Sequence, residues 1–303
     1  MGVSSKFIWQ QGPALSALGR TAIAAMTQSV TGPPKQAPAT PGPELRLSLP
    51  ARSSELVKTY VEHVGGTSSA YKGMVPAHLF PQWGFGLAGK TLDGIPYPLA
   101  RVMNGGCRLE IFEQLPADEE LTITACLESI DDNGRRAVLH QKVRTTTPSA
   151  QQGIVAHMYP IVPLPRKKGE PKRAKKEPAC VPEDAREIAR WSLKADAGLD
   201  FAKLTGDFNP IHWISGYAKM FGFKNTILHG FSTMARTIES LHQALYAGVP
   251  RIRVFDARFT KPLVLPADVG VYILDDEVFV GKAPGGPAFM VATFSTDAPS
   301  HSL

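Results

Sequence analysis

The feature that most constrains the fold is an internal repeat. The tetrapeptide Leu-Pro-Ala-Asp occupies 115–118 and occurs again 150 residues later, at 265–268. In both copies an alternating apolar and polar pattern, typical of a β-strand, precedes the tetrapeptide, and two further strand patterns follow it. A shared order of strands and turns indicates a repeated structural unit. The chain is therefore predicted to contain two similar antiparallel sheets.

Each copy is also preceded by a segment with helical character. In the second copy, residues 227–246 carry apolar side chains every three or four residues, which marks one buried helix face. The segment 76–92 holds the corresponding place in the first copy, although Pro81 and several glycines weaken its helical pattern. Each half is thus predicted to be a long buried helix wrapped by a curved antiparallel sheet, an α+β architecture.

The remaining segments set the expected boundaries. Residues 1–43 contain no Asp or Glu and end in a proline-rich stretch, which predicts a flexible N-terminal arm. The two halves are expected over 44–165 and 179–303. Between them, residues 166–178 hold seven Lys or Arg and two Glu, and are predicted to form an extended basic linker.

Composition excludes several classes of protein. No apolar run is long enough for a membrane span. Almost all of the net charge of +6 lies in the basic linker, which lacks the interleaved aromatic residues of a nucleic-acid surface. The cysteines at 107, 126 and 180 form no C-x-x-C pair, so neither a disulfide framework nor a structural zinc site is expected. A reducing compartment, the cytoplasm, is the preferred location, with the mitochondrion as the alternative suggested by the acid-free start.

One segment of the second half carries a constellation of reactive groups. Residues 204–231 read LTGDFNPIHWISGYAKMFGFKNTILHGF. Asn209-Pro210 forces a turn, because a residue before proline avoids the helical region. Asp207 and His212 stand five positions apart across this turn and can point to the same side. A carboxylate and an imidazole that hold one water form a general acid/base pair.

The same segment ends where the long helix is expected to begin. His229-Gly230 opens that helix, whose first N–H groups lack intrahelical acceptors and point outward. A carbonyl oxygen docked there would be stabilised as it gains negative charge. Together with the acid/base pair, this site suits the addition of water to an activated carbonyl compound, or its removal.

At this point the residues resemble a known family. The pattern G-D-x-N-P-x-H at 206–212, followed by H-G at 229–230, resembles the signature of the MaoC-like, or (R)-specific enoyl-CoA hydratase, family. The resemblance implies a double hotdog fold over most of the chain beyond the N-terminal arm. It also implies reversible hydration of trans-2-enoyl thioesters to (3R)-3-hydroxyacyl thioesters, a hydro-lyase reaction of fatty acid metabolism.

The resemblance assigns roles to the matched positions. Asp207 and His212 would be the water-binding catalytic dyad, with Asn209 as a supporting polar group. The Gly230 N–H would be the oxyanion donor to the thioester carbonyl. In the hydration direction Asp207 would take a proton from the water and His212 would deliver one to C2, although the sequence leaves open which of the two is the acid.

Further contacts with substrate are expected around this core. His229 and Phe231 flank the oxyanion donor in the sequence. In the basic linker, Lys167, Lys168 and Arg173 would meet the phosphates of coenzyme A or an acidic carrier protein. A plain solvated linker remains the alternative for that strip.

The first half lacks the motif. A fixed offset of 150 residues places Val57 and Glu62 opposite the dyad, and His63 nearby has no upstream Asp partner. This resembles double-hotdog members of the family in which one half keeps the chemistry and the other is degenerate.

Two rival functions stay open. One is a dehydratase that acts on substrates carried by acyl carrier protein in a fatty-acid or polyketide pathway. The other is a non-catalytic acyl-thioester binding module or a thioesterase, in which the dyad is structural. No cofactor or metal is expected beyond the coenzyme A or pantetheine of the substrate, because G-x-G-x-x-G at 84–89 follows no strand and metal-ligand spacing is missing. The two halves could pair within one chain, so both a monomer and a homodimer are possible.

Overall fold

The computed structural model describes residues 2–12, 14–16, 19–20, 27–28, 31–165 and 177–299. The strands of the first half are β1 (Leu45–Leu49), β2 (Met74–Val75), β3 (Met103–Ile111), β4 (Leu115–Pro116), β5 (Leu121–Asp132), β6 (Arg136–Thr146) and β7 (Ile154–Pro163). Those of the second half are β8 (Arg186–Leu193), β9 (Val254–Phe259), β10 (Ala267–Leu274), β11 (Glu277–Gly281) and β12 (Ala288–Ser295). The helices are α2 (Ser54–His63), α3 (Pro81–Lys90), α4 (Ala197–Thr205), α5 (Ser215–Met220) and α6 (Gly230–Tyr246). Short 3-10 turns are η1 (Ser5–Gln11), η2 (Ser68–Tyr71), η3 (Ala77–Leu79), η4 (Leu99–Arg101) and η5 (Pro210–His212).

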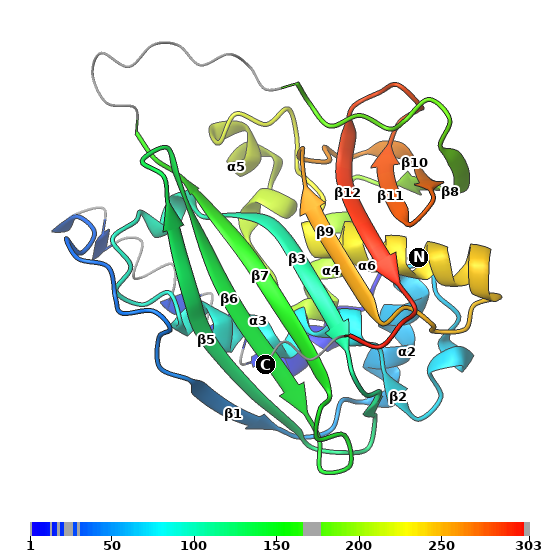
Figure 1. Ribbon diagram of the computed structural model, residues 1–303, viewed down its shortest axis with the longest axis horizontal. Coiled ribbons are helices and arrows are strands. Elements are labelled where there is room, and N and C mark those ends of the chain that lie inside the picture. Colours follow the sequence, from blue (N-terminus) through cyan, green and yellow to red (C-terminus); the bar gives the residue numbers. More distant parts are fainter. Residues whose placement is uncertain are drawn as a thin grey trace.

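The main strands of both halves pair into one antiparallel sheet (Figure 1). Its order is β1-β5-β6-β7-β3-β9-β12-β11-β10-β8, so the second half mirrors the first across the β3–β9 pair. Alternating burial along β5 and β6 shows why these segments form strands with one face on the core. The predicted repeat is confirmed: the first Leu-Pro-Ala-Asp copy includes β4 and leads into β5, and the second leads into the corresponding strand β10.

The two central helices lie on one side of this sheet (Figure 1). In α3, Trp83 and Leu87 are buried, and the Trp83 Nε1–H donates to Thr145 Oγ1 on β6 at 2.9 Å. In α6 the buried face includes Phe231, Met234 and other predicted apolar positions. One hydrophobic core includes side chains from both halves. The predicted α+β class is therefore confirmed.

The N-terminal segment differs from the expected flexible arm. Residues 5–11 form η1, and Phe7 is buried. The side-chain amide of Gln11 is also buried and donates to the carbonyl oxygens of Lys203 and Leu204 on α4. The prediction of a flexible arm is wrong for η1, because an apolar ring and a saturated buried amide hold it on the second half.

The basic linker falls largely outside the described residues. Residues 166–176 lie there, and with them Lys167, Lys168 and Arg173. Within the described ranges, no helix is both long and apolar enough to cross a membrane.

Candidate active site

A glycine sets the direction of the chain into the site. Helix α4 ends at Gly206, which has a φ of 80° and donates its N–H to the Ala202 carbonyl at 2.8 Å. This left-handed end is favoured at glycine because a side chain there is strained. The following turn carries Asp207, whose Oδ1 accepts the Asn209 N–H at 3.3 Å. A backbone N–H thus holds one oxygen of the Asp207 carboxylate, and the other oxygen, Oδ2, faces His229.

Asn209 acts within the turn rather than across the site. Its side chain is exposed, and its Oδ1 accepts the Ile211 N–H at 3.3 Å as the N-cap of η5. Pro210 follows at the first position of η5, where a missing N–H costs nothing. Asn209 therefore supports the dyad through the local fold, since its backbone N–H fixes Asp207 and its side chain starts the turn that ends at His212.

The fold brings Asp207, His212 and His229 together. One side-chain ligand atom from each lies within 4.8 Å of the other two. The two imidazoles stack with centroids 3.6 Å apart and planes inclined by 23°. His229 Nε2 lies 3.8 Å from Asp207 Oδ2. The predicted dyad and the predicted neighbour His229 are thus parts of one cluster.

Hydrogen bonds to carbonyl oxygens assign the tautomer of each imidazole. His212 Nδ1 lies 2.8 Å from the Ile227 carbonyl oxygen, and His229 Nε2 lies 2.9 Å from the Asp207 carbonyl oxygen. A carbonyl oxygen only accepts, so both of these nitrogens carry the proton. His212 Nε2 is therefore left as a bare acceptor beside the Asp207 carboxylate.

Burial keeps both rings neutral near pH 7. Burial lowers the pKa of His212, against the opposing effects of the Asp207 charge and the bond to Ile227. The pKa of His229 falls to about 3, through burial first and then the neighbouring His212. Two neutral imidazoles and one carboxylate make the resting site a proton acceptor.

The start of α6 lies beside this cluster. Gly230 is the first residue of the helix and His229 its N-cap, so the Gly230 N–H has no intrahelical acceptor. A methyl group at Gly230 would lie 2.9 Å from three atoms of the Phe259 ring. Phe231 is buried and makes edge-on ring contacts with Phe80, Phe85 and Phe259. Phe231 therefore packs in the core next to Gly230. The absence of a side chain at Gly230 lets the start of α6 approach the Phe259 ring closely.

Comparison with known proteins bears on the part of the chain that holds this cluster. Residues 173–283, which contain the cluster and the start of α6, match the family model described as MaoC like domain. The chain carries a MaoC-like domain. It resembles the 3-hydroxyacyl-thioester dehydratase X of Mycobacterium tuberculosis, with 36% identity over 77 residues that cover 25% of this chain and 26% of the relative. It also resembles the peroxisomal enoyl-CoA hydratase 2 of Arabidopsis thaliana, with 23% identity over 56% of this chain and 59% of the relative.

The solved structures extend the likeness to both halves. The crystal structure of HtdX from Mycobacterium tuberculosis matches with a TM-score of 0.64 at 20% identity, over 82% of this chain and 98% of the other. At this identity the likeness shows the fold, and the fold is the double hotdog. The chain spans between 26% and 59% of the length of the first curated relatives that it matches.

The three-residue cluster also bears on the expectation of no metal. Sequence spacing showed no metal-ligand pattern, but the fold places Asp207, His212 and His229 close enough to reach one ion. Sequence spacing was therefore a poor guide to possible metal ligands, because His229 comes from the start of a separate helix, α6. An ion at His212 would compete for the same Nε2 that faces the carboxylate, since Nδ1 is engaged by Ile227.

The first half contains positions that correspond to the cluster, and a fixed offset missed them. Turn η2 follows α2 as η5 follows α4, and Tyr71 ends η2 as His212 ends η5. His78 then stands before α3 as His229 stands before α6. Tyr71 and His78 make an edge-on ring contact with centroids 6.1 Å apart.

Assignment of Val57 and Glu62 as the counterparts of the dyad is therefore wrong. Both lie in α2, which corresponds to α4 and not to the turn after it. Gly66 holds the place of Asp207, so the first half has no carboxylate of its own there. Gly66 and Tyr71, and not Val57 and Glu62, are therefore the residues that replace Asp207 and His212 in this half.

Replacement of Gly230 by Ala tests the close approach at the donor. We expect Gly230→Ala to lower kcat by roughly tenfold or more, because the methyl group displaces the helix start from Phe259 and moves the N–H. Phe259→Leu in the same chain should restore part of the loss. Steady-state kinetics of the single and double variants measure this, and equal kcat for Gly230→Ala and wild type would contradict the role of the helix start.

Proposed function

We propose that the chain is a hydro-lyase that interconverts trans-2-enoyl and (3R)-3-hydroxyacyl thioesters. The observation that carries this proposal is the bare Nε2 of His212 beside the Asp207 carboxylate, at the start of a buried helix. The names of the relatives, a 3-hydroxyacyl-thioester dehydratase and an enoyl-CoA hydratase 2, support the same reaction class. The catalytic roles of Asp207, His212 and Gly230 are part of this proposal.

In the hydration direction the dyad takes and returns a single proton. A water held by Asp207 and His212 Nε2 attacks C3 of the enoyl thioester, and its proton passes to the dyad. The thioester oxygen gains negative charge and is stabilised by the Gly230 N–H. The dyad then delivers the proton to C2, so one water is consumed and the site returns to its resting state. Dehydration is the reverse of these steps.

Hydration of a conjugated thioester gives a direct assay. Loss of the enoyl thioester absorbance should follow addition of the protein to crotonyl-CoA or to a long-chain enoyl-CoA. Activity on either chain length supports a hydro-lyase. If the protein hydrates neither substrate but still binds acyl-CoA, the rival function of a binding module or thioesterase would be favoured.

The pH dependence of the reaction follows from His212. Its pKa in the folded protein lies below the ordinary value of 6.5 because the ring is buried. His212 therefore stays neutral, and able to accept a proton, as the pH falls from 7 through 6.5. We expect the acid limb of the kcat/KM profile to lie below pH 6.5, and a limb above that value would contradict a buried neutral acceptor.

The carrier of the acyl group is part of the proposal. We favour coenzyme A, with acyl carrier protein as the alternative, because the basic linker suits either partner. Replacement of Lys167, Lys168 and Arg173 by Gln should raise KM roughly three- to tenfold and leave kcat unchanged, since these charges would act on binding alone. Parallel assays with enoyl-CoA and enoyl-carrier protein identify the partner. An unchanged KM for both substrates would mean that the basic linker only connects the two halves and does not bind substrate.

Compartment and assembly are also proposed. The three cysteines are free, which suits the reducing cytoplasm. A fluorescent fusion tests the cytoplasm against the mitochondrion.

The two halves already pair within one sheet, so we propose that this internal pair replaces a dimer and that the protein is a monomer. A molar mass of a homodimer from light scattering would overturn this.

A further inference from the structure

The buried polar atoms without a partner share one place in the fold. Among the described residues, five buried side-chain nitrogen or oxygen atoms have no hydrogen-bond partner, and all five lie on α6 or at its N-cap. They are His229 Nδ1, Ser232 Oγ, Arg236 Nε, Glu239 Oε2 and His242 Nε2. Their spacing of three, four, three and three residues puts them on one face of the helix. We call these five residues the polar stripe of α6.

The polar stripe faces the first half. Arg236 Nη2 donates to His63 Nε2 on α2 at 3.2 Å. Further along, a methyl group at Gly66 would clash with the Glu239 carboxylate, so the two approach closely. Glu239 is fully buried, and His78 Nε2 lies 2.8 Å from its Oε1. The stripe therefore runs along the boundary between the two halves.

The polar stripe needs partners that the described side chains do not supply. A buried polar group without a hydrogen bond costs about 1–3 kcal/mol, so five such groups together would cost about as much as the whole stability of a domain. Residues three or four apart on a helix have Cβ atoms about 5–6 Å apart, a gap that one water bridges with two hydrogen bonds. The stripe also mixes donors, such as Arg236 Nε–H, with acceptors, such as Glu239 Oε2, as a chain of waters requires.

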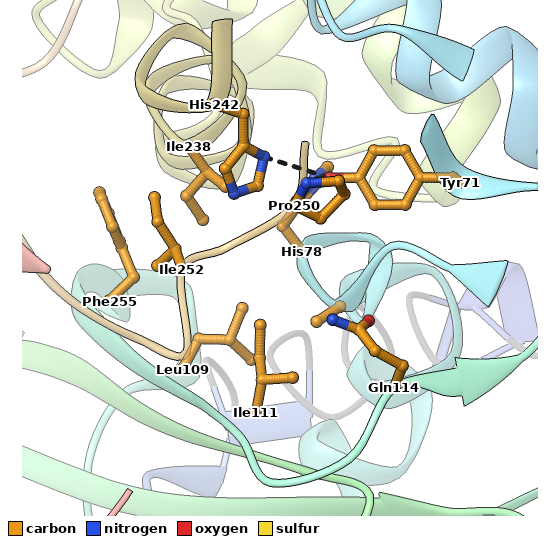
Figure 2. A pocket seen from close by; sticks show the side chains of 11 residues that line it. Tyr71, His78, Leu109, Ile111, Gln114, Ile238, His242, Pro250, Ile252 and Phe255 are labelled. Atoms are coloured by element: carbon orange, nitrogen blue, oxygen red, sulfur yellow. Dashed lines mark hydrogen bonds between the residues drawn. The ribbon is translucent and has the colours of Figure 1, made fainter. Parts of the chain in front are cut away.

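The two ends of the polar stripe lead to defined places. One end is His229, which belongs to the candidate active site. The other end is His242, which lines a cavity of about 20 Å³ together with Tyr71 and His78 (Figure 2). This volume holds one water. Gln114 and Pro250, both partly exposed, also line that cavity (Figure 2).

We propose that the polar stripe holds a file of water molecules that connects this cavity with the active site and supplies the water that is added to the substrate. The inference rests on the proposed hydro-lyase function. Each hydration consumes one water and each dehydration releases one, while a bound acyl thioester fills the front of the site. A second route along α6 lets water pass without loss of the acyl group. The reaction has no net proton change, so the file carries water rather than protons.

The waters themselves provide the first test, and it needs no activity. A high-resolution crystal structure of the full chain should show ordered waters within hydrogen-bond distance of Ser232 Oγ, Arg236 Nε and His242 Nε2. A dry stripe, with these atoms bonded directly to other side chains, would overturn the inference even if the protein is an active hydratase. Lack of hydratase activity, by contrast, would overturn the proposed function. The ordered waters would still be present or absent in the crystal structure, so the two failures are distinguishable.

A plug in the file tests the delivery of water. Ser232 is fully buried and is the stripe residue next to the His229 end, and Ser232→Val removes its hydroxyl and adds bulk. We expect a roughly tenfold fall in kcat, with KM for the acyl thioester unchanged, because the blocked step follows binding. The matched control is Thr237→Val on the same helix, whose hydroxyl donates to the Thr233 carbonyl at 2.9 Å and lies off the stripe. Equal kcat for Ser232→Val and this control would overturn the delivery of water.

Discussion

Replacement of Asp207 by Asn is expected to lower kcat about a thousandfold and to leave the fold and KM nearly unchanged. In the proposed reaction Asp207 takes a proton in the transition state, and the amide of Asn cannot do so. The amide keeps an oxygen for the Asn209 N–H, which now holds Asp207 Oδ1, so the turn is preserved. Stopped-flow or steady-state measurement of enoyl thioester absorbance gives kcat, and circular dichroism checks the fold.

A surface carboxylate supplies the control for this variant. Asp268, in the second Leu-Pro-Ala-Asp copy, is exposed, and Asp268→Asn should retain full activity. If Asp207→Asn also keeps activity within about threefold of wild type, the carboxylate takes no part in proton transfer. The hotdog would then serve as a binding module, or the proton would pass through His212 alone.

The largest expected effect on stability comes from Glu239. Its carboxylate is fully buried and contacts His78 Nε2, the Tyr71 hydroxyl and, at 3.8 Å, His242 Nδ1. Glu239→Gln has the same shape but removes the negative charge between two imidazoles. Loss of one partner from a buried charged cluster costs about 3–5 kcal/mol, so we expect a fall of about 3 kcal/mol in the free energy of unfolding. Urea denaturation at pH 7 measures it.

The pH dependence of stability should change in the same variant. Burial raises the pKa of Glu239, but the neighbouring imidazoles of His242 and His78 outweigh it and bring the pKa to about 2. This carboxylate contributes stability above its ordinary pKa of 4.5, and the contribution is lost as the pH falls toward 2. Glu239→Gln should therefore flatten the decline in stability between these values.

Glu55 offers the matched comparison for Glu239. It pairs with Lys6 while more than half exposed, so Glu55→Gln should change the free energy of unfolding by less than about 1 kcal/mol. Similar losses for the two variants would mean that the buried cluster contributes no more than a surface pair.

The sequence predicted those parts of the molecule that have local signals. Strand alternation and the Leu-Pro-Ala-Asp copies reveal the repeat because both halves keep the same turns. The Asp207 and His212 pair could be found because Gly206 and Pro210 fix their turn within seven residues. The counterpart in the first half was missed because helix α5 lengthens the second half: 17 positions separate His212 from His229, but seven separate Tyr71 from His78.

Contacts between distant segments could not be predicted in this way. His78 and Glu239 are 161 residues apart, and neither stands in a recognisable motif. Only the packing of α6 against the first half brings them together. The same holds for Phe7 and Gln11, whose burial depends on distant segments such as α3 and α4 and not on the composition of residues 1–43.

The mirrored order of the strands makes the two halves thermodynamically inseparable. Where β3 and β9 pair, the backbone of one half completes the ladder of the other. A cut between the halves would leave β3 and β9 as unpaired edge strands, each a template for aggregation. We therefore expect the half without the Asp207 turn to stabilise the other half, because it covers the edge that β9 would otherwise expose.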